Sequence, residues 1–386
     1  MSMAQPLYDL SPMLHVMLMG IVLALGPLSW IWVRNPKAAP ARRLQALTLL
    51  TLFLTFDLVV FGAFTRLTDS GLGCPDWPGC YGNASPQGAH AEISRAQAEM
   101  PTGPVTHGKA WIEMIHRYLA TGVGVLIMTL AAATWLQRKR GAVAADPWWP
   151  TATLVWVCVQ GAFGALTVTM KLFPAIVTLH LLGGMVLLAL LCRQAVSYSH
   201  AERGAGPVPV AGGTRNLLLA AVAALWLQVA LGGWVSTNYA VLACTEFPAC
   251  QGSWWPAMNF TQGFELWREL GKTGGGEHIT FAALSAIHYA HRLFAYVLFV
   301  VLALVVWQLH RSASLPAQRR WIAGLAFLQL ATGVSNVVLG WPMLAALVHT
   351  GGAAALVVVL TWALCETRPA TLATHGEPID AREMSA

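Results

Sequence analysis

Charged residues are what this sequence has least of. Asp, Glu, Lys and Arg together make up only 10% of its 386 residues, well below the roughly 25% of a typical soluble domain, whereas 56% are hydrophobic. Several apolar runs reach the roughly 20 residues that an α-helix needs to cross a bilayer. This composition excludes a soluble globular protein and indicates an all-α polytopic membrane protein in contact with lipid. The net charge of +6 comes without any basic cluster interleaved with aromatic residues, so we expect no nucleic-acid partner.

A basic segment is also missing in front of the first apolar run. A secretory signal peptide would carry positive charges there, but here the Lys and Arg residues follow the run. We therefore expect a retained membrane helix, the first of nine predicted spans. Their approximate bounds are 13–33, 45–65, 112–136, 149–170, 175–197, 215–236, 281–309, 320–340 and 343–364.

Lys and Arg residues are concentrated on alternate sides of these spans. The positive-inside rule assigns such clusters to the cytoplasm. With nine spans all five clusters fall on one side, so the predicted topology is N-out/C-in. The clusters are Arg34/Lys37/Arg42/Arg43, Arg138/Lys139/Arg140, Arg193/Arg203/Arg215, Arg311/Arg319/Arg320 and Arg368/Arg382.

Two segments of the chain repeat one another's spacings on either side of a Gly- and Pro-rich stretch. In each, a glycine stands 12 residues before the first cysteine of a C-x5-C pair, and a glutamine stands 20 residues before a histidine. Such a repeat predicts a duplicated chain of two pseudo-symmetric four-helix transmembrane bundles, related by an axis along the membrane normal. The matching positions are Gly62 and Gly232, Cys74/Cys80 and Cys244/Cys250, Gln160 and Gln329, His180 and His349, and His116-Arg117 and His291-Arg292.

The duplication sets the expected organisation of the chain. Two stretches outside the spans, near 89–100 and 263–270, are expected to form short surface helices over the outer ends of the bundles. The five expected parts are 1–44, an extra N-terminal transmembrane helix and cytoplasmic loop; 45–200, the N-terminal bundle; 201–214, a cytoplasmic linker; 215–366, the C-terminal bundle; and 367–386, a cytoplasmic tail.

Four histidines occupy matching positions near the outer ends of their spans. His116 and His180 belong to the N-terminal bundle, and His291 and His349 to the C-terminal one. Two imidazoles at similar depth on different helices are how bundle proteins hold a metal or a haem. A structural zinc site usually needs four ligands, whereas two imidazoles complete the coordination of a haem iron. The spacing therefore favours one haem iron in each bundle, with these histidines as axial ligands.

The two bundles differ at one informative position. Glu113 lies three residues before the first bundle's His-Arg pair, and His288 lies three residues before the second. A carboxylate beside only one porphyrin suggests unequal roles, with Glu113 relaying protons or orienting a water; the alternative is that it only pairs with Arg117. Arg117 and Arg292 could each pair with haem propionates or extend to lipid phosphate. His288 is an alternative ligand in the second bundle.

The cysteine pairs lie in the predicted external loops. An oxidising compartment favours a disulfide in each, Cys74–Cys80 and Cys244–Cys250, and C-x5-C is not a common zinc spacing. The sequence leaves open whether these disulfides brace the loops or cycle during turnover. Asp57, within the second span, could relay protons or make an internal hydrogen bond.

The chain closely resembles the haem A synthase family from about residue 45 to 365. The resemblance is carried by Thr65-Arg66-Leu67-Thr68, by the stretch from Ser70 to Pro78 (SGLGCPDWP), by Glu113-x-x-His116-Arg117 and by the paired later histidines. It implies an oxidoreductase that converts a ring methyl of haem O into a formyl group through hydroxylated intermediates, giving haem A for terminal oxidases.

The resemblance also implies distinct roles for the halves. Haem O would bind as substrate at His116 and His180, with Glu113 as the essential carboxylate, and a haem b cofactor would bind at His291 and His349. The implied location is a bacterial cytoplasmic (inner) membrane, with the haem sites toward its extracytoplasmic side. Implied partners are haem O synthase (a farnesyltransferase) and cytochrome oxidase assembly factors, and a homo-oligomer is compatible with the pattern. The extra first helix departs from the family's eight spans, and a non-catalytic di-haem b electron-transfer protein is the main alternative.

Overall fold

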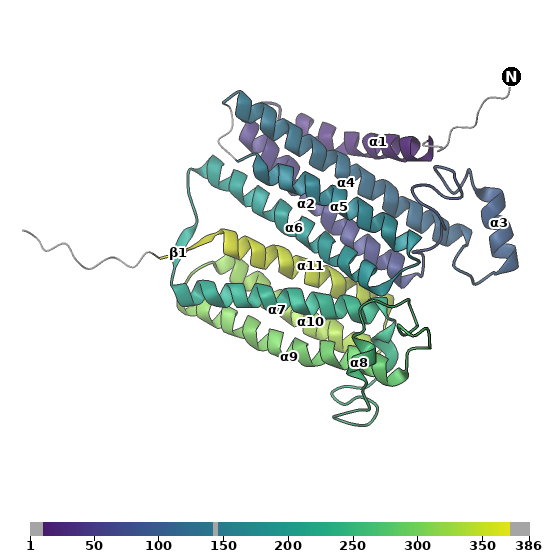
Figure 1. Cartoon of the computed structure of the whole chain (residues 1–386). Coiled ribbons are helices and arrows are strands. Elements are labelled where there is room, and N and C mark those ends of the chain that lie inside the picture. The colour runs from purple at the N-terminus through teal and green to yellow at the C-terminus, as the bar shows by residue number, and fades with distance from the viewer. Residues whose placement is uncertain (1–10, 142–145, 371–386) are drawn as a thin grey trace, which may run out of the picture.

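The computed structural model describes residues 11–141 and 146–370, and it is almost entirely helical (Figure 1). Within those residues nine helices are long and apolar enough to cross a membrane, which confirms the all-α polytopic architecture. The end of the predicted cytoplasmic tail lies outside the described residues. The nine helices are α1 (Ser11–Arg34), α2 (Pro40–Leu67), α4 (His107–Lys139), α5 (Trp148–Thr169), α6 (Pro174–Arg203), α7 (Gly212–Thr237), α9 (Phe281–Arg311), α10 (Pro316–Val338) and α11 (Met343–Cys365).

Local sequence signals explain where the site-bearing helices begin. Thr106 caps α4 by accepting a hydrogen bond from Lys109 N at 3.3 Å, and Thr280 caps α9 in the same way. α6 begins at Pro174, whose fixed φ suits the first turn of a helix, and α11 follows Pro342. The two halves of the chain therefore start their corresponding helices with the same chemistry.

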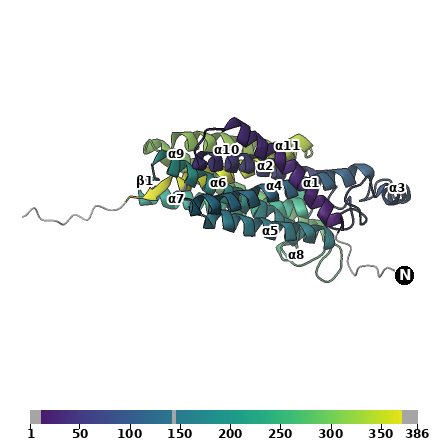
Figure 2. The ribbon, with the colours of Figure 1, turned by 90° about the horizontal axis from the view of Figure 1, so that it is seen from above.

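The helices pack in two groups. α2, α4, α5 and α6 pack around one another, as do α7, α9, α10 and α11, while α1 lies against α4 on the outside of the first group (Figures 1 and 2). The groups meet where α6 and α2 contact α7 and α11. Leucine-rich interiors fill both groups, with buried Leu126, Leu130 and Leu191 in the first and Leu218 and Leu302 in the second. This grouping matches the two predicted bundles, whose residue boundaries stay a prediction.

Polar contacts join the two groups at the end that carries the long loops. Arg66, at the end of α2, donates a hydrogen bond to Ser236 O at 2.5 Å, and its guanidinium lies 3.7 Å from the centroid of the Tyr239 ring. The hydroxyls of Thr178 in α6 and Thr237 in α7 are 3.1 Å apart. Hydrogen-bonded side chains of this kind hold neighbouring membrane helices together where apolar packing alone gives little preference for protein over lipid.

The linker and the start of the tail form regular structure. β1 (Val208–Val210) pairs in parallel with β2 (Thr367–Pro369), so that Val208 faces Thr367. Arg215 at the start of α7 reinforces the ladder by donating to Thr367 O at 2.5 Å. This small sheet ties the end of the second group of helices to the connection between the groups.

The loops beyond the opposite helix ends contain three short helical segments: α3 (His90–Glu99), η1 (Ala240–Ala243) and α8 (Phe260–Gly263) (Figure 1). α3 confirms the surface helix predicted at 89–100. The surface helix predicted at 263–270 is wrong, because α8 already ends at Gly263. There the backbone approaches α9 so closely that a Cβ would lie 2.8 Å from Ala283 O, and the following Glu265 accepts a hydrogen bond from the backbone of Gly274 instead of extending a helix.

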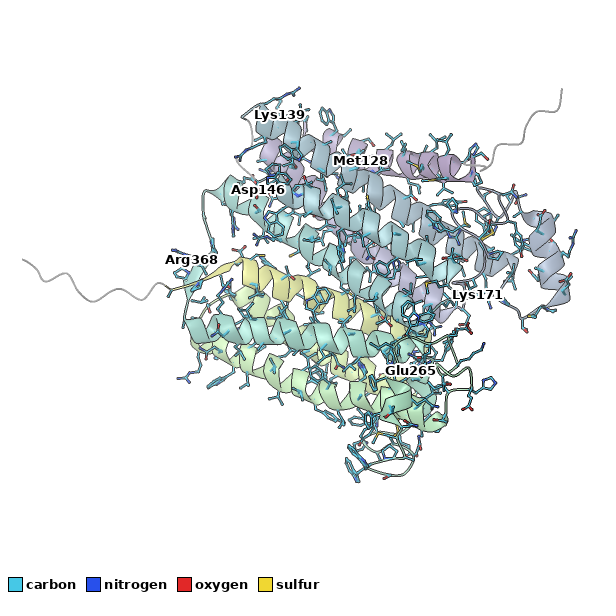
Figure 3. The ribbon with its side chains drawn as sticks, in the orientation of Figure 1. Met128, Lys139, Asp146, Lys171, Glu265 and Arg368 are labelled. Atoms are coloured by element: carbon cyan, nitrogen blue, oxygen red, sulfur yellow. A yellow bond between two sulfur atoms is a disulfide. The ribbon has the colours of Figure 1, made fainter. Side chains whose placement is uncertain are left out.

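The small sheet and the site histidines belong to opposite ends of the helices. Figure 3 places Lys139 and Arg368 at the end that carries β1 and β2, and Lys171 and Glu265 at the end that carries α3 and α8. The four site histidines belong to the second end. Each lies about 9 to 15 Å along its helix from the first residue, at a rise of about 1.5 Å per residue.

Candidate functional site

Glu113 lies on α4 beneath the first cysteine loop and is only 4% exposed. One carboxylate oxygen accepts a hydrogen bond from Cys74 N at 2.7 Å, and the other pairs with the Arg117 guanidinium. A buried charge must be paired and hydrogen-bonded to be tolerated, and this carboxylate is both. The pairing with Arg117 foreseen as an alternative is therefore present, together with a loop contact that sequence reasoning missed.

Arg117 is engaged mainly with the loop. Its Nη1 donates to the carbonyl oxygens of Asp76 at 2.9 Å and Gly79 at 2.5 Å. Arg292 does the same in the second half, donating to Pro248 O at 3.2 Å and Ala249 O at 2.9 Å. Both arginines thus hold a cysteine loop against the helix below it, and their pairing with haem propionates stays a prediction.

Both predicted disulfides are confirmed. Cys74–Cys80 and Cys244–Cys250 are each closed, and all four cysteines are buried. The first loop is braced further by Asp76, whose carboxylate accepts hydrogen bonds from the backbone of Tyr81 and Gly82 at 2.6 and 2.7 Å. Glu246 does the same in the second loop, where it accepts a hydrogen bond from the backbone of Gly252 at 3.1 Å.

The first histidine pair has one member on α4 and the other on α6. His116 and His180 are half-buried and lie close enough to interact electrostatically. Each imidazole faces a glycine of a neighbouring helix: a Cβ on Gly62 would lie 3.1 Å from His116 Nε2, and one on Gly164 would lie 3.5 Å from His180 Cε1. The Nδ1 atom of His180 is buried and has no hydrogen-bond partner among the described residues.

The second pair likewise has one member on α9 and the other on α11. His291 and His349 are half-buried and within electrostatic range of each other. A Cβ on Gly232 would lie 2.9 Å from His291 Cε1, and one on Gly333 would lie 3.4 Å from His349 Cε1. The structure therefore brings together, within each half, the two histidines that the repeat predicts.

Polar side chains contact both histidines of the second pair, whereas in the first pair His116 bonds to the backbone of Leu58. The Gln228 amide lies 3.0 Å from His291 Nδ1, and the Thr332 hydroxyl lies 2.9 Å from His349 Nδ1. These two residues were not singled out from the sequence. The signal that could have found them is the comparison of matching positions, because the first half has apolar residues there, Leu58 and Phe163.

His288 and Arg292 show how the second half differs beside its cysteine loop. His288 stands where the first half has Glu113, and its Nδ1 bonds to Ala240 O at 3.0 Å, which gives it a structural role at the loop. Nη2 of Arg292, which has no carboxylate to pair with, is buried and finds no acceptor in the described chain. A buried guanidinium with a free N–H group suits an anionic oxygen.

The residues of both halves fit haem. Within the described residues there is no group of three or more His, Cys, Asp and Glu side chains that could hold a metal ion by protein ligands alone. Two imidazoles on facing helices, each next to a glycine where a side chain would intrude, match an iron that already has four porphyrin nitrogens. The unpartnered Arg292 Nη2 is a polar group that such a ligand could help to satisfy.

Asp57 is not part of this arrangement. Its side chain is exposed on α2 within the span, and none of the hydrogen bonds of the described residues involves it. Neither the relay nor the internal hydrogen bond considered for it is supported by a contact.

The sequence of this chain is similar to those of proteins that already carry a name. The sequence profile of a family described as "Cytochrome oxidase assembly protein" matches residues 45–361, so that α1 lies outside the match. A protein of Shewanella oneidensis named "Heme A synthase" is 37% identical over 321 residues, which cover 81% of this chain and 92% of that protein. Proteins of the same name from Halalkalibacterium halodurans and Caulobacter vibrioides are 25% and 27% identical, covering 79% and 80% of this chain and 89% and 91% of theirs.

Proposed function

The chain belongs to the haem A synthase family of cytochrome oxidase assembly proteins, and we propose that it is the oxidoreductase that converts haem O to haem A for terminal oxidases. The reaction oxidises one ring methyl of haem O to a formyl group through hydroxylated intermediates. The observation that carries the proposal for this chain is the position of Glu113, a buried carboxylate held between α4 and the Cys74 loop beside the first histidine pair only.

The first bundle is the proposed substrate site. His116 on α4 and His180 on α6 would hold the iron of haem O, and the glycines beside them leave room for the two imidazole rings. Glu113 is anchored at both oxygens, so its carboxylate has a fixed position near the bound substrate. From there it can accept a proton released at the methyl carbon or hold a water in place. Arg117, bound to the loop carbonyls, fixes the carboxylate and keeps the loop closed over the site.

The second bundle is the proposed site of a haem b cofactor. His291 and His349 would hold its iron, and the unpartnered Nη2 of Arg292 would be available to a propionate oxygen. Haem b supplies one-electron redox capacity when bound. The absence of a carboxylate at the His288 position fits a site that exchanges electrons and performs no proton chemistry of its own.

We propose that both haem sites lie toward the extracytoplasmic side of a bacterial inner membrane. Lys139 and Arg368, members of two basic clusters, lie at the end of the helices that carries β1 and β2 (Figure 3). The histidines and both disulfides belong to the other end. The positive-inside rule assigns the basic end to the cytoplasm, and disulfides persist in an oxidising compartment. The proposed partners follow from the chemistry: haem O synthase, which must supply the farnesylated substrate, and oxidase assembly factors, which must accept haem A.

Haem content tests the proposal against the alternative of a di-haem electron carrier. The chain is purified from cells that make haem O and from cells that do not, and the bound pigments are extracted and separated by chromatography. We expect haem b in both preparations, and haem O or haem A in addition only when haem O is supplied. Two equivalents of haem b in both preparations would support the electron carrier and overturn the proposal.

A further inference from the structure

The hydroxyl group of Thr332 is hydrogen-bonded to the imidazole of His349. The Thr332 Oγ1 donates its single hydrogen to Leu328 O at 2.7 Å and lies 2.9 Å from His349 Nδ1. With the hydroxyl proton directed at Leu328 O, the oxygen accepts a hydrogen bond from Nδ1–H. The proton of the neutral imidazole therefore sits on Nδ1, and Nε2 is left as the nitrogen free to bind iron. Thr332 is only 8% exposed, so this bond is largely shielded from solvent.

The first half has no hydroxyl group at the position that matches Thr332. The residue equivalent to Thr332 is Phe163, since both stand three residues after the matching glutamines. The imidazoles are placed alike, because Cε1 lies 3.5 Å from the Cβ position of Gly164 in the first half and 3.4 Å from that of Gly333 in the second. Only the partner differs, and His180 Nδ1 is buried without one in the part of the chain that the structure describes.

The glutamines three residues before these positions, Gln329 and Gln160, also differ in their hydrogen bonds. Gln329 Nε2 donates to the backbone carbonyl of His349 at 2.8 Å, which ties the histidine's own peptide to α10. Nε2 of the matching Gln160 is buried and has no partner within the described residues. Within the described residues, His349 is thus fixed at both its ring and its backbone, whereas no such contact holds His180.

We propose that Thr332 is a positioning residue that makes the second bundle the tight haem site, and that Phe163 makes the first an exchangeable one. This inference rests on the proposed function, because a cofactor must stay bound whereas a substrate must enter and its product must leave. A hydrogen bond to the second nitrogen of an iron-ligating histidine fixes the tautomer and the ring orientation and strengthens the ligand; its loss typically costs about 10- to 100-fold in metal affinity.

The first test measures haem loss from the second bundle. Purified Thr332→Val, Thr332→Ser and wild-type protein are mixed with excess apomyoglobin, and the transfer of haem b is followed by its Soret absorption. We expect Thr332→Val to lose haem b at least about tenfold faster than wild type. Its midpoint potential should also rise, because a weaker imidazole donor stabilises ferric iron less. Thr332→Ser, which keeps the hydroxyl, should restore both values.

Ser335→Ala is the matched control. Ser335 lies one turn further along α10, and among the described residues its hydroxyl bonds only to Ala331 O of its own helix. This variant should release haem b at the wild-type rate. If Thr332→Val and Ser335→Ala behave alike, with unchanged release and potential, Thr332 has no positioning role and the inference is overturned.

The second test adds the hydroxyl to the first bundle. Phe163→Thr, purified with bound haem O, should release haem O about tenfold more slowly than wild type, while haem b release stays unchanged. Unchanged haem O release in a variant that still binds haem b would refute the part assigned to Phe163. Failure of the proposed function has a different signature, since the wild-type protein would then hold no haem O at all.

Discussion

Replacing Glu113 with Gln is expected to lower haem A formation by at least about 100-fold, the smallest loss typical for removal of a general acid or base. The amide keeps the size of the side chain and can still accept the hydrogen bond from Cys74 N. It cannot take up a proton or carry the charge that pairs with Arg117. The measurement is chromatography of pigments extracted from cells that make haem O, with haem b bound to the purified variant as the check on folding.

Asp57→Asn is the control for Glu113→Gln. Asp57 is a carboxylate on a span of the same bundle, but it is exposed and lies outside the site. This variant should form haem A at close to the wild-type level. If Glu113→Gln also stays within a few-fold of wild type, proton chemistry at Glu113 is not part of the reaction, and the pairing with Arg117 is its whole role.

The two histidine pairs are expected to fail in different ways when they are disrupted. His349→Ala removes a ligand of the proposed cofactor site, so the purified protein should lose most of its haem b and form no measurable haem A. His180→Ala removes a ligand of the proposed substrate site, so the protein should keep haem b with an unchanged spectrum and still form no haem A. Absorption spectra of the purified variants, together with pigment extraction, separate the two outcomes.

His310→Ala is the comparison variant for the histidine substitutions. His310 lies at the opposite end of α9, where its ring contacts Arg319 at 2.8 Å, and it should affect neither haem b content nor haem A formation. Loss of haem b from His180→Ala and its retention in His349→Ala would reverse the assignment of the bundles. Equal loss from both would point to two equivalent permanent haems, as in an electron carrier.

The helices and the histidine pairs could be predicted from the sequence because their signals are local or repeated. Apolar runs of the length of a bilayer define the spans, and the constant spacing between matching residues relates His180 to His349 without any knowledge of the fold. The close approach of His116 to His180 follows once both are assigned to similar depths on helices of one bundle. The disulfides were predictable for the same reason, since each pair is separated by only six residues.

The contacts that could not be predicted from the sequence are made by backbone N–H and C=O groups, which every residue type carries. The contact of Glu113 with Cys74 N and that of Arg117 with Gly79 O exist because a loop folds back over the start of α4. The pairing of β1 with β2 joins segments far apart in the chain, and each is only three residues long. The end of α8 at Gly263 depends on its close approach to α9, which a composition suited to a helix cannot reveal.

The most direct test of the central claim is haem A formation by the wild-type chain in a bacterial host that makes haem O and whose own haem A synthase gene has been deleted. Membranes of this host are extracted, and their pigments are separated by chromatography and identified by mass. We predict that haem A appears when the chain is expressed and is absent with the empty vector. If the wild-type chain is folded, as shown by bound haem b, and haem O alone accumulates, the chain is not a haem A synthase.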